Sequence, residues 1–227
     1  MYLALLALAA LALSLLPETV TARARRFAPQ LDIELPAAVR AEFLPAAMGV
    51  FSGFFVLGLF VGLMPSFLGN DLHWTSHALG GALVFLLYSV AAATEAAARR
   101  LADRTALGRG LLILPVALVI IVLAFAHASL PVFLVGTVLG GIAVGLVFIG
   151  GQSTVNRIAP ADRRAAVASC LFVAAYLGFA APVVAVGVAS VHVGTLRATT
   201  GAAVVFAVIS ACALTVLRRA GPHKRRT

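Results

Sequence analysis

Long apolar runs alternate with short polar gaps along almost the whole chain. Seven of these runs have, or nearly have, the roughly 20 residues that a helix needs to cross a bilayer core about 30 Å thick. They cover residues 1–16, 44–67, 78–98, 110–127, 131–154, 166–190 and 197–217. The runs are too uniformly apolar for the alternating strands of a membrane barrel. A helix also satisfies every backbone polar group inside its own segment, so the pattern predicts an all-α integral membrane protein.

The composition excludes a water-soluble globule, because 62% of the residues are hydrophobic and only 11% are charged. A net charge of +9 on its own would be compatible with nucleic-acid binding. The basic residues, however, form separate clusters between the apolar runs, which is typical of membrane flanks. We therefore expect the lipid bilayer as a partner and no nucleic acid.

The basic clusters also predict the orientation of the chain. All but one of the 17 Lys and Arg residues lie in alternate gaps and in the tail, at 17–43, 99–109, 155–165 and 218–227. Short loops rich in Lys and Arg stay on the cytoplasmic side. The sequence thus predicts a multi-pass protein of the inner (plasma) membrane with its N-terminus outside and its C-terminus in the cytoplasm. Residues 99–110 are expected to form a short cytoplasmic turn.

The first run has two readings. It could be a signal peptide, with Val20-Thr21-Ala22 as a weak cleavage site, but it lacks a basic leading region, and the next segment carries four arginines. We favour the end of a helix that has lost its beginning, in a fragment or a reading frame that starts late.

Two motifs indicate a family. The first is Leu101-Ala102-Asp103-Arg104 followed by Gly108-Arg109, and the second is Ala159-Pro160-Ala161-Asp162-Arg163-Arg164-Ala165. The first resembles the cytoplasmic loop motif G-x-L-A-D-R-x-G-R of the major facilitator superfamily, with Arg99 in place of the first glycine and two extra residues before Gly108. The second is similar to the P-x-x-x-R turn that opens the eleventh helix in many members. With these motifs between the expected helices, the chain resembles the C-terminal half of such a transporter.

The resemblance implies a six-helix major-facilitator-type half bundle preceded by one extra apolar helix. Residues 1–16 would correspond to the end of the sixth family helix, 17–43 to the cytoplasmic central loop, 44–217 to the six-helix bundle and 218–227 to a basic cytoplasmic tail. The implied function is alternating-access transport of a small-molecule substrate, of the drug or metabolite efflux type. The chain would be incomplete without the missing N-terminal half or a second subunit.

The alternative is a polytopic membrane protein that does not transport, such as an assembly factor or a receptor. An intramembrane enzyme is disfavoured, because the sequence has no H-E-x-x-H motif, no paired membrane aspartates and no Ser/His constellation. We predict no catalytic residues, no cofactor and no metal site.

The resemblance also nominates residues for a cytoplasmic gate: Asp103, Arg104, Arg109 and Arg163. A carboxylate near a helix end caps backbone amides and pairs with neighbouring guanidinium groups. In the family such a cluster latches the inner face. The alternative is a solvated charge run that only sets the topology.

Few polar or ionisable groups lie inside the predicted spans. Glu95 is a possible proton site, or an i,i+4 ion-pair partner of Arg99. Gly141 and Gly145 predict a close helix approach, and Gln152 on the same stripe would bond another helix or face a watery cavity. The remaining substrate-cavity candidates are aromatic: Phe51, Phe55, Tyr88, Phe172 and Tyr176.

Overall fold

The described part of the chain is a bundle of long helices. The computed structural model describes residues 37–219 except 75 and 162, together with Leu6, Leu8, Leu11 and Ala12. These residues belong to two compact units, Met1–Ile33 and Glu34–Thr227, and the helical bundle lies in the second. Most of the predicted helix at 1–16, the loop up to residue 36 and most of the tail therefore lie outside the described residues.

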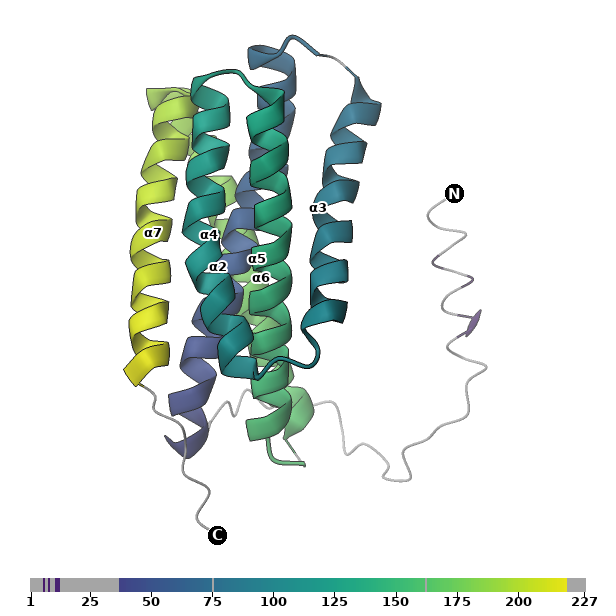
Figure 1. Ribbon diagram of the computed structural model, residues 1–227, viewed down its shortest axis with the longest axis vertical. Coiled ribbons are helices and arrows are strands. Elements are labelled where there is room, and N and C mark those ends of the chain that lie inside the picture. The colour runs from purple at the N-terminus through teal and green to yellow at the C-terminus, as the bar shows by residue number, and fades with distance from the viewer. Residues whose placement is uncertain are drawn as a thin grey trace. The chain divides into compact units, whose positions relative to one another are not determined.

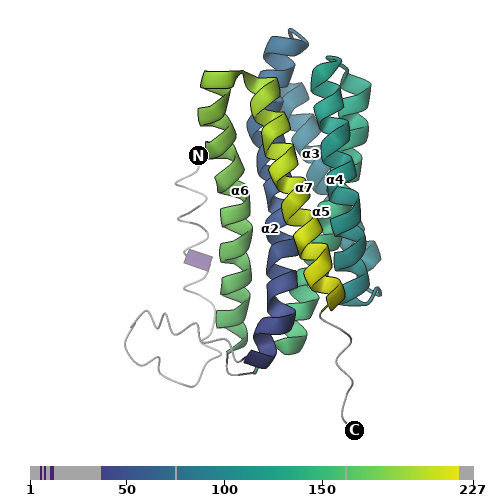
Figure 2. The same ribbon diagram turned by 90° about the vertical axis from the view of Figure 1, so that its left-hand side faces the viewer.

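Six helices in the described part are long and apolar enough to cross a membrane. The elements are α2 (Ala37–Ser66), the short π-helix η1 (Phe67–Asp71), α3 (His77–Ala98), α4 (Asp103–Ala126), α5 (Leu130–Ile158), α6 (Arg164–Val193) and α7 (Thr195–Arg219). The helices lie side by side along one direction, as Figures 1 and 2 show. The predicted all-α membrane fold is confirmed, and so are the six spans after residue 43.

The helix ends follow local sequence signals. Ser76 caps α3 by accepting a hydrogen bond from the amide of Leu79 at 3.4 Å. Proline occupies the first turn of α5, where its missing N–H is harmless. Gly194 follows α6 with φ of +82°, a conformation that favours glycine.

One boundary was predicted wrongly. The turn expected over residues 99–110 is much shorter, because α4 begins at Asp103. Asp103, Arg104 and Arg109 therefore lie on the first turns of a helix. Their polarity imitates a loop, but an acidic residue in the first turn also favours a helix start through the helix dipole.

The central helix is α2, which packs against α4, α5, α6 and α7, whereas α3 packs mainly against α5. Phenylalanines fill the core where α2, α4 and α5 meet: the Phe67 ring lies 4.7 Å from the rings of both Phe125 and Phe133, and Phe60 stacks on Phe133 at 5.2 Å. Such pairs contribute about 0.5–1.5 kcal/mol each beyond the area they bury.

Glycines set the distances between the helix backbones. An alanine Cβ at position 145 of α5 would lie 2.5 Å from the carbonyl oxygen of Ala91 on α3, and one at position 141 would lie 2.8 Å from that of Leu87. The predicted close approach at Gly141 and Gly145 is confirmed, and α3 is its partner. Gly58 of α2 likewise meets the carbonyl of Phe179 on α6, and Gly178 of α6 meets that of Phe51. Helices associate in lipid through such tight packing.

Candidate functional site

Three phenylalanines from three helices form a continuous aromatic path. The ring of Phe148 on α5 lies 5.9 Å from Phe54 on α2 and 6.3 Å from Phe172 on α6. Phe54 and Phe148 are half-buried and Phe172 is exposed, so the path reaches the surface of the bundle. We call it the aromatic face.

Two further cavity candidates lie next to this face. Gln152 follows Phe148 by one helical turn, and Tyr176 follows Phe172 by one turn, so each shares a stripe with its aromatic neighbour. Tyr176 is 68% exposed. Gln152 is half-buried, and its amide makes no hydrogen bond with any residue that the structure describes.

The other aromatic candidates are placed differently. Phe55 is buried in the core, where its ring lies 5.3 Å from Phe206 of α7. Phe51 packs on Phe55 at 6.4 Å. Tyr88 is half-exposed on α3 and has no ring contact with another described aromatic residue. The candidates chosen from the sequence thus include the buried Phe55 and the half-buried Phe51 but not Phe54, which belongs to the aromatic face.

A charged cluster joins three helices at the opposite end from the η1 turn. Nη2 of Arg157 on α5 lies 2.7 Å from Oε2 of Glu42 on α2 and 2.7 Å from Oδ2 of Asp103 on α4. Nε of Arg157 donates to the same Asp103 oxygen at 2.9 Å. The hydroxyl of Thr154 lies 3.3 Å from Asp103 Oδ2. One guanidinium thus bridges two carboxylates, in the charge-assisted geometry that makes such bonds strong.

The fourth helix joins through Arg104, whose guanidinium donates to the backbone carbonyl of Leu217 on α7. Gly150 of α5 makes room for the start of α4, because a Cβ there would lie 2.8 Å from the carbonyl oxygen of Asp103. The cluster of Glu42, Asp103, Arg104 and Arg157 therefore fastens one end of α2, α4, α5 and α7. We call it the charge clamp.

The remaining charged candidates lie outside the charge clamp. Arg109 and Arg163 are exposed, and Arg163 precedes α6. Glu95 is half-buried near the end of α3. The described residues include no direct ion pair between Glu95 and Arg99, although Arg99 is near enough to act electrostatically on the Glu95 carboxylate. Within the same described ranges, no three His, Cys, Asp or Glu side chains are grouped to hold a metal ion.

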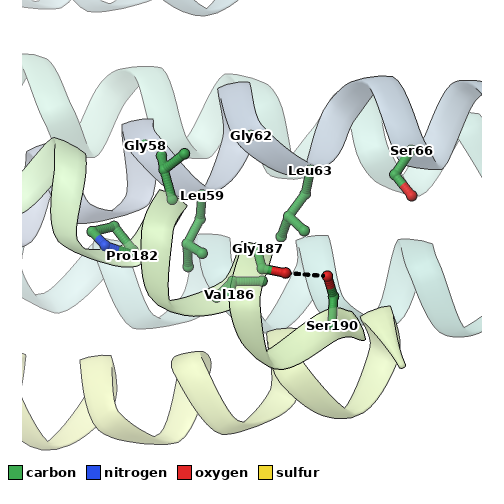
Figure 3. A pocket seen from close by; sticks show the side chains of 10 residues that line it. Gly58, Leu59, Gly62, Leu63, Ser66, Pro182, Val186, Gly187 and Ser190 are labelled. Carbon is green, nitrogen blue, oxygen red and sulfur yellow. Dashed lines mark hydrogen bonds between the residues drawn. The ribbon is translucent and has the colours of Figure 1, made fainter. Parts of the chain in front are cut away.

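A cavity of about 230 Å³ separates α2 from α6 beyond Gly58. Figure 3 shows Leu59 and Leu63 pointing from α2 toward α6, where Ser190 donates a hydrogen bond to the carbonyl of Gly187 at 2.8 Å. Pro182 lies at the other end of this wall, inside α6. The cavity lies between the C-terminal parts of α2 and α6.

Comparison with known protein families decides the assignment. The family model of the Major Facilitator Superfamily matches residues 46–227. The chain belongs to the major facilitator superfamily. No curated protein and no solved structure matches the chain.

Major facilitator proteins are membrane transporters, so this multi-pass chain is a transport protein of the permease type. The family prediction made from the two sequence motifs is confirmed. The match covers all of α3 to α7 and most of α2, which includes the aromatic face and every member of the charge clamp except Glu42.

Sequence reasoning missed two residues of the charge clamp. Glu42 was assigned to the central loop and Arg157 to a topology-setting gap, yet both are helical. A local pattern does not reveal a bridge between residues 115 positions apart. The sequence did contain one signal for Arg157: Gly150, Thr154 and Arg157 share one face of a helix, which places the arginine on the same side as a small residue and a hydroxyl.

Proposed function

We propose that α2 to α7 form the C-terminal half of a major facilitator permease that exports amphipathic drugs or metabolites by alternating access. The observation that carries this proposal is the aromatic face with the unpaired amide of Gln152 beside it. Aromatic side chains with a few placed polar groups suit small amphipathic molecules. A polar side chain inside a membrane span normally faces a bundle interior or a water-filled cavity.

The same face supports the need for a second helical bundle. Tyr176 exposes its phenolic ring, and Gln152 lacks a partner among the described residues. Contact with lipid tails would leave these polar groups unsatisfied. We infer that an N-terminal half or a second subunit covers the face and encloses a watery pathway, as rocking of two bundles about a midplane site requires.

We place the charge clamp at the cytoplasmic side as part of the gate. Support comes from the basic clusters, which predict that the 99–102 turn and the 159–163 turn are cytoplasmic. Asp103 and Arg104 of the clamp were both nominated from the family motif. The clamp would keep the inner ends of four helices together while their outer ends move.

Thiol labelling in native membranes tests the pathway. In a variant lacking Cys170 and Cys212, Gln152→Cys should react with a small water-soluble methanethiosulfonate, and an amphipathic dye such as ethidium should slow the reaction. Val119→Cys is the matched control, because Val119 is exposed on α4, which contributes no residue to the aromatic face. Equal, slow labelling at both positions would refute a watery pathway along this face.

Two further measurements test the remaining parts of the proposal. Cysteines at Asn70 and Ala102, both exposed, should be labelled from outside and from inside the cell, respectively, by an impermeant reagent. The reverse pattern would overturn the orientation. The purified chain alone in liposomes should not move ethidium, and transport by this chain alone would contradict the need for a second bundle.

A further inference from the structure

A second pocket lies where α2 passes through η1 into α3. Its volume is about 580 Å³, and its lining includes Met64, Pro65, Leu68, Trp74, Gly81 and Val84. No charged side chain lines it. We call it the outer pocket, after the side of the membrane on which the proposed orientation places it.

The backbone around the outer pocket is unusual. A π-helix, here η1, is rare and often marks a functional site. His73 adopts φ of +55°, which is uncommon for a residue other than glycine. The amide of Trp74 donates to the carbonyl of Leu68 at 2.8 Å, so the turn folds back and holds the indole beside the pocket.

Glycines keep the walls of the pocket bare. A Cβ at Gly69 of η1 or at Gly81 of α3 would meet no atom within 4 Å. Close packing therefore does not account for these glycines, unlike Gly141 and Gly145. Glycine inside a helix costs about 1 kcal/mol relative to alanine. The space that Gly81 leaves open in α3 is a reason for its presence.

The pocket also offers hydrogen-bond donors. The Ser76 hydroxyl oxygen accepts a hydrogen bond from the amide of Leu79, which leaves the hydroxyl proton of Ser76 available to donate. The indole N–H of Trp74 donates to no residue within the described ranges. Both groups belong to the lining, so a ligand that carries an acceptor would satisfy them.

We propose that the outer pocket binds an uncharged, mainly apolar small molecule that carries a hydrogen-bond acceptor. Its volume falls within the range of about 300–1,000 Å³ found for small-molecule sites. The lack of charged lining disfavours an ionic ligand, which would lose its hydration without compensation.

The outer pocket lies on the side of α3 that carries Tyr88, one of the candidate substrate-cavity residues. Gly81 lies seven residues before Tyr88 on α3, so the two residues share a side of that helix. This inference rests on the proposed function for its meaning in transport. In that case the pocket would be a binding site at the outer end of the same transport pathway.

Trp74 is the single tryptophan of the chain, so its fluorescence reports on this pocket alone. The full chain in phosphatidylcholine nanodiscs is titrated with prodan, an uncharged naphthalene ketone that accepts energy from tryptophan. Binding in the pocket should quench Trp74 emission with saturation, above the linear quenching caused by prodan dissolved in the bilayer. Linear quenching without a saturable component would overturn the proposal.

Filling the pocket tests its location. Gly81→Leu and Gly69→Leu add a side chain to its lining from α3 and from η1, and the open space around both glycines favours normal folding. Each variant should raise the prodan concentration at half-saturation at least about tenfold, which corresponds to a loss of ~1.4 kcal/mol of binding free energy. Gly201→Leu is the matched control, because it is exposed on α7 and also has no atom within 4 Å of a Cβ. An unchanged prodan concentration at half-saturation in both pocket variants would refute the proposed binding site.

The other molecule that could occupy the outer pocket is a lipid from the bilayer. Nanodiscs made with lipid brominated on the acyl chains distinguish it, since bromine quenches tryptophan on contact. Stronger quenching in the native chain than in Gly81→Leu, together with no saturable prodan signal, would mean that lipid fills the pocket and would overturn the proposal. Because the titration measures binding, a saturable signal together with equal, slow labelling of Gln152→Cys and Val119→Cys would refute only the proposed function.

Discussion

The contact between α3 and α5 depends on the absence of one methyl group at position 145. In Gly145→Ala, the new Cβ would lie 2.5 Å from the carbonyl oxygen of Ala91 and 3.0 Å from Cβ of Thr94. Real Cβ contacts are almost never shorter than 3.0 Å, so α3 has to retreat by at least half an ångström. Since α3 packs mainly against α5, no other helix compensates for the lost contacts.

The expected magnitude follows from two opposing effects. Overpacking costs about 1–3 kcal/mol, and replacing a helical glycine by alanine recovers up to about 1 kcal/mol. We therefore expect Gly145→Ala to lower the free energy of unfolding by about 1–2 kcal/mol. Gly140→Ala on the same helix is the control, because its Cβ would meet only Leu87 Cδ1 at an ordinary 3.7 Å. That variant should be neutral or up to about 1 kcal/mol more stable.

Equilibrium unfolding by SDS in mixed micelles measures the difference. Circular dichroism follows total helix, and Trp74 emission follows the region just before α3, since the chain has no other tryptophan. Gly145→Ala should shift both midpoints to lower SDS. Identical midpoints for the two variants would refute the argument that Gly145 is required for the close approach of α3.

Two other variants test features of the described bundle. Asp103→Asn removes one of the two carboxylates that pair with Arg157. Because the Arg157 side chain is 47% exposed, solvent screening limits the expected loss in the free energy of unfolding to about 1 kcal/mol. Arg109→Gln, an exposed control, should leave the SDS midpoint unchanged. Gly194→Ala should destabilise by about 1 kcal/mol through its φ of +82° alone, because no atom lies within 4 Å of the new Cβ. Gly201→Ala, equally open, should not destabilise, and equal losses at both glycines would show that backbone strain is not the cause.

Periodic features of the sequence predicted the fold well. Run lengths gave the six described spans, and the four-residue spacing of Gly141 and Gly145 gave a close helix contact. The spacing could not identify α3 as the partner, because a stripe defines a face of one helix and not its neighbour. The start of α4 was hidden because Asp103 and Arg104 are as polar as a loop.

The candidate site was predicted less completely, because its residues come together only in three dimensions. Phe51, Phe54 and Phe55 lie on one broad face of α2, and only the packing of α5 against Phe54 and of α7 against Phe55 decides the surroundings of each ring. Asp103 was expected to pair with nearby arginines, but its partner is Arg157 on another helix. Such choices depend on contacts between segments far apart in the chain.

The burial of α2 bears on how the protein is made. Among the described helices α2 leaves the ribosome first, yet its surface at Gly58 is completed only by Phe179 of α6. About 100 residues separate the end of α2 from the start of α6, which corresponds to on the order of 10 seconds of translation. Throughout that interval the helix that becomes the centre of the bundle has to wait beside the translocon, with lipid or a chaperone in place of its later neighbours.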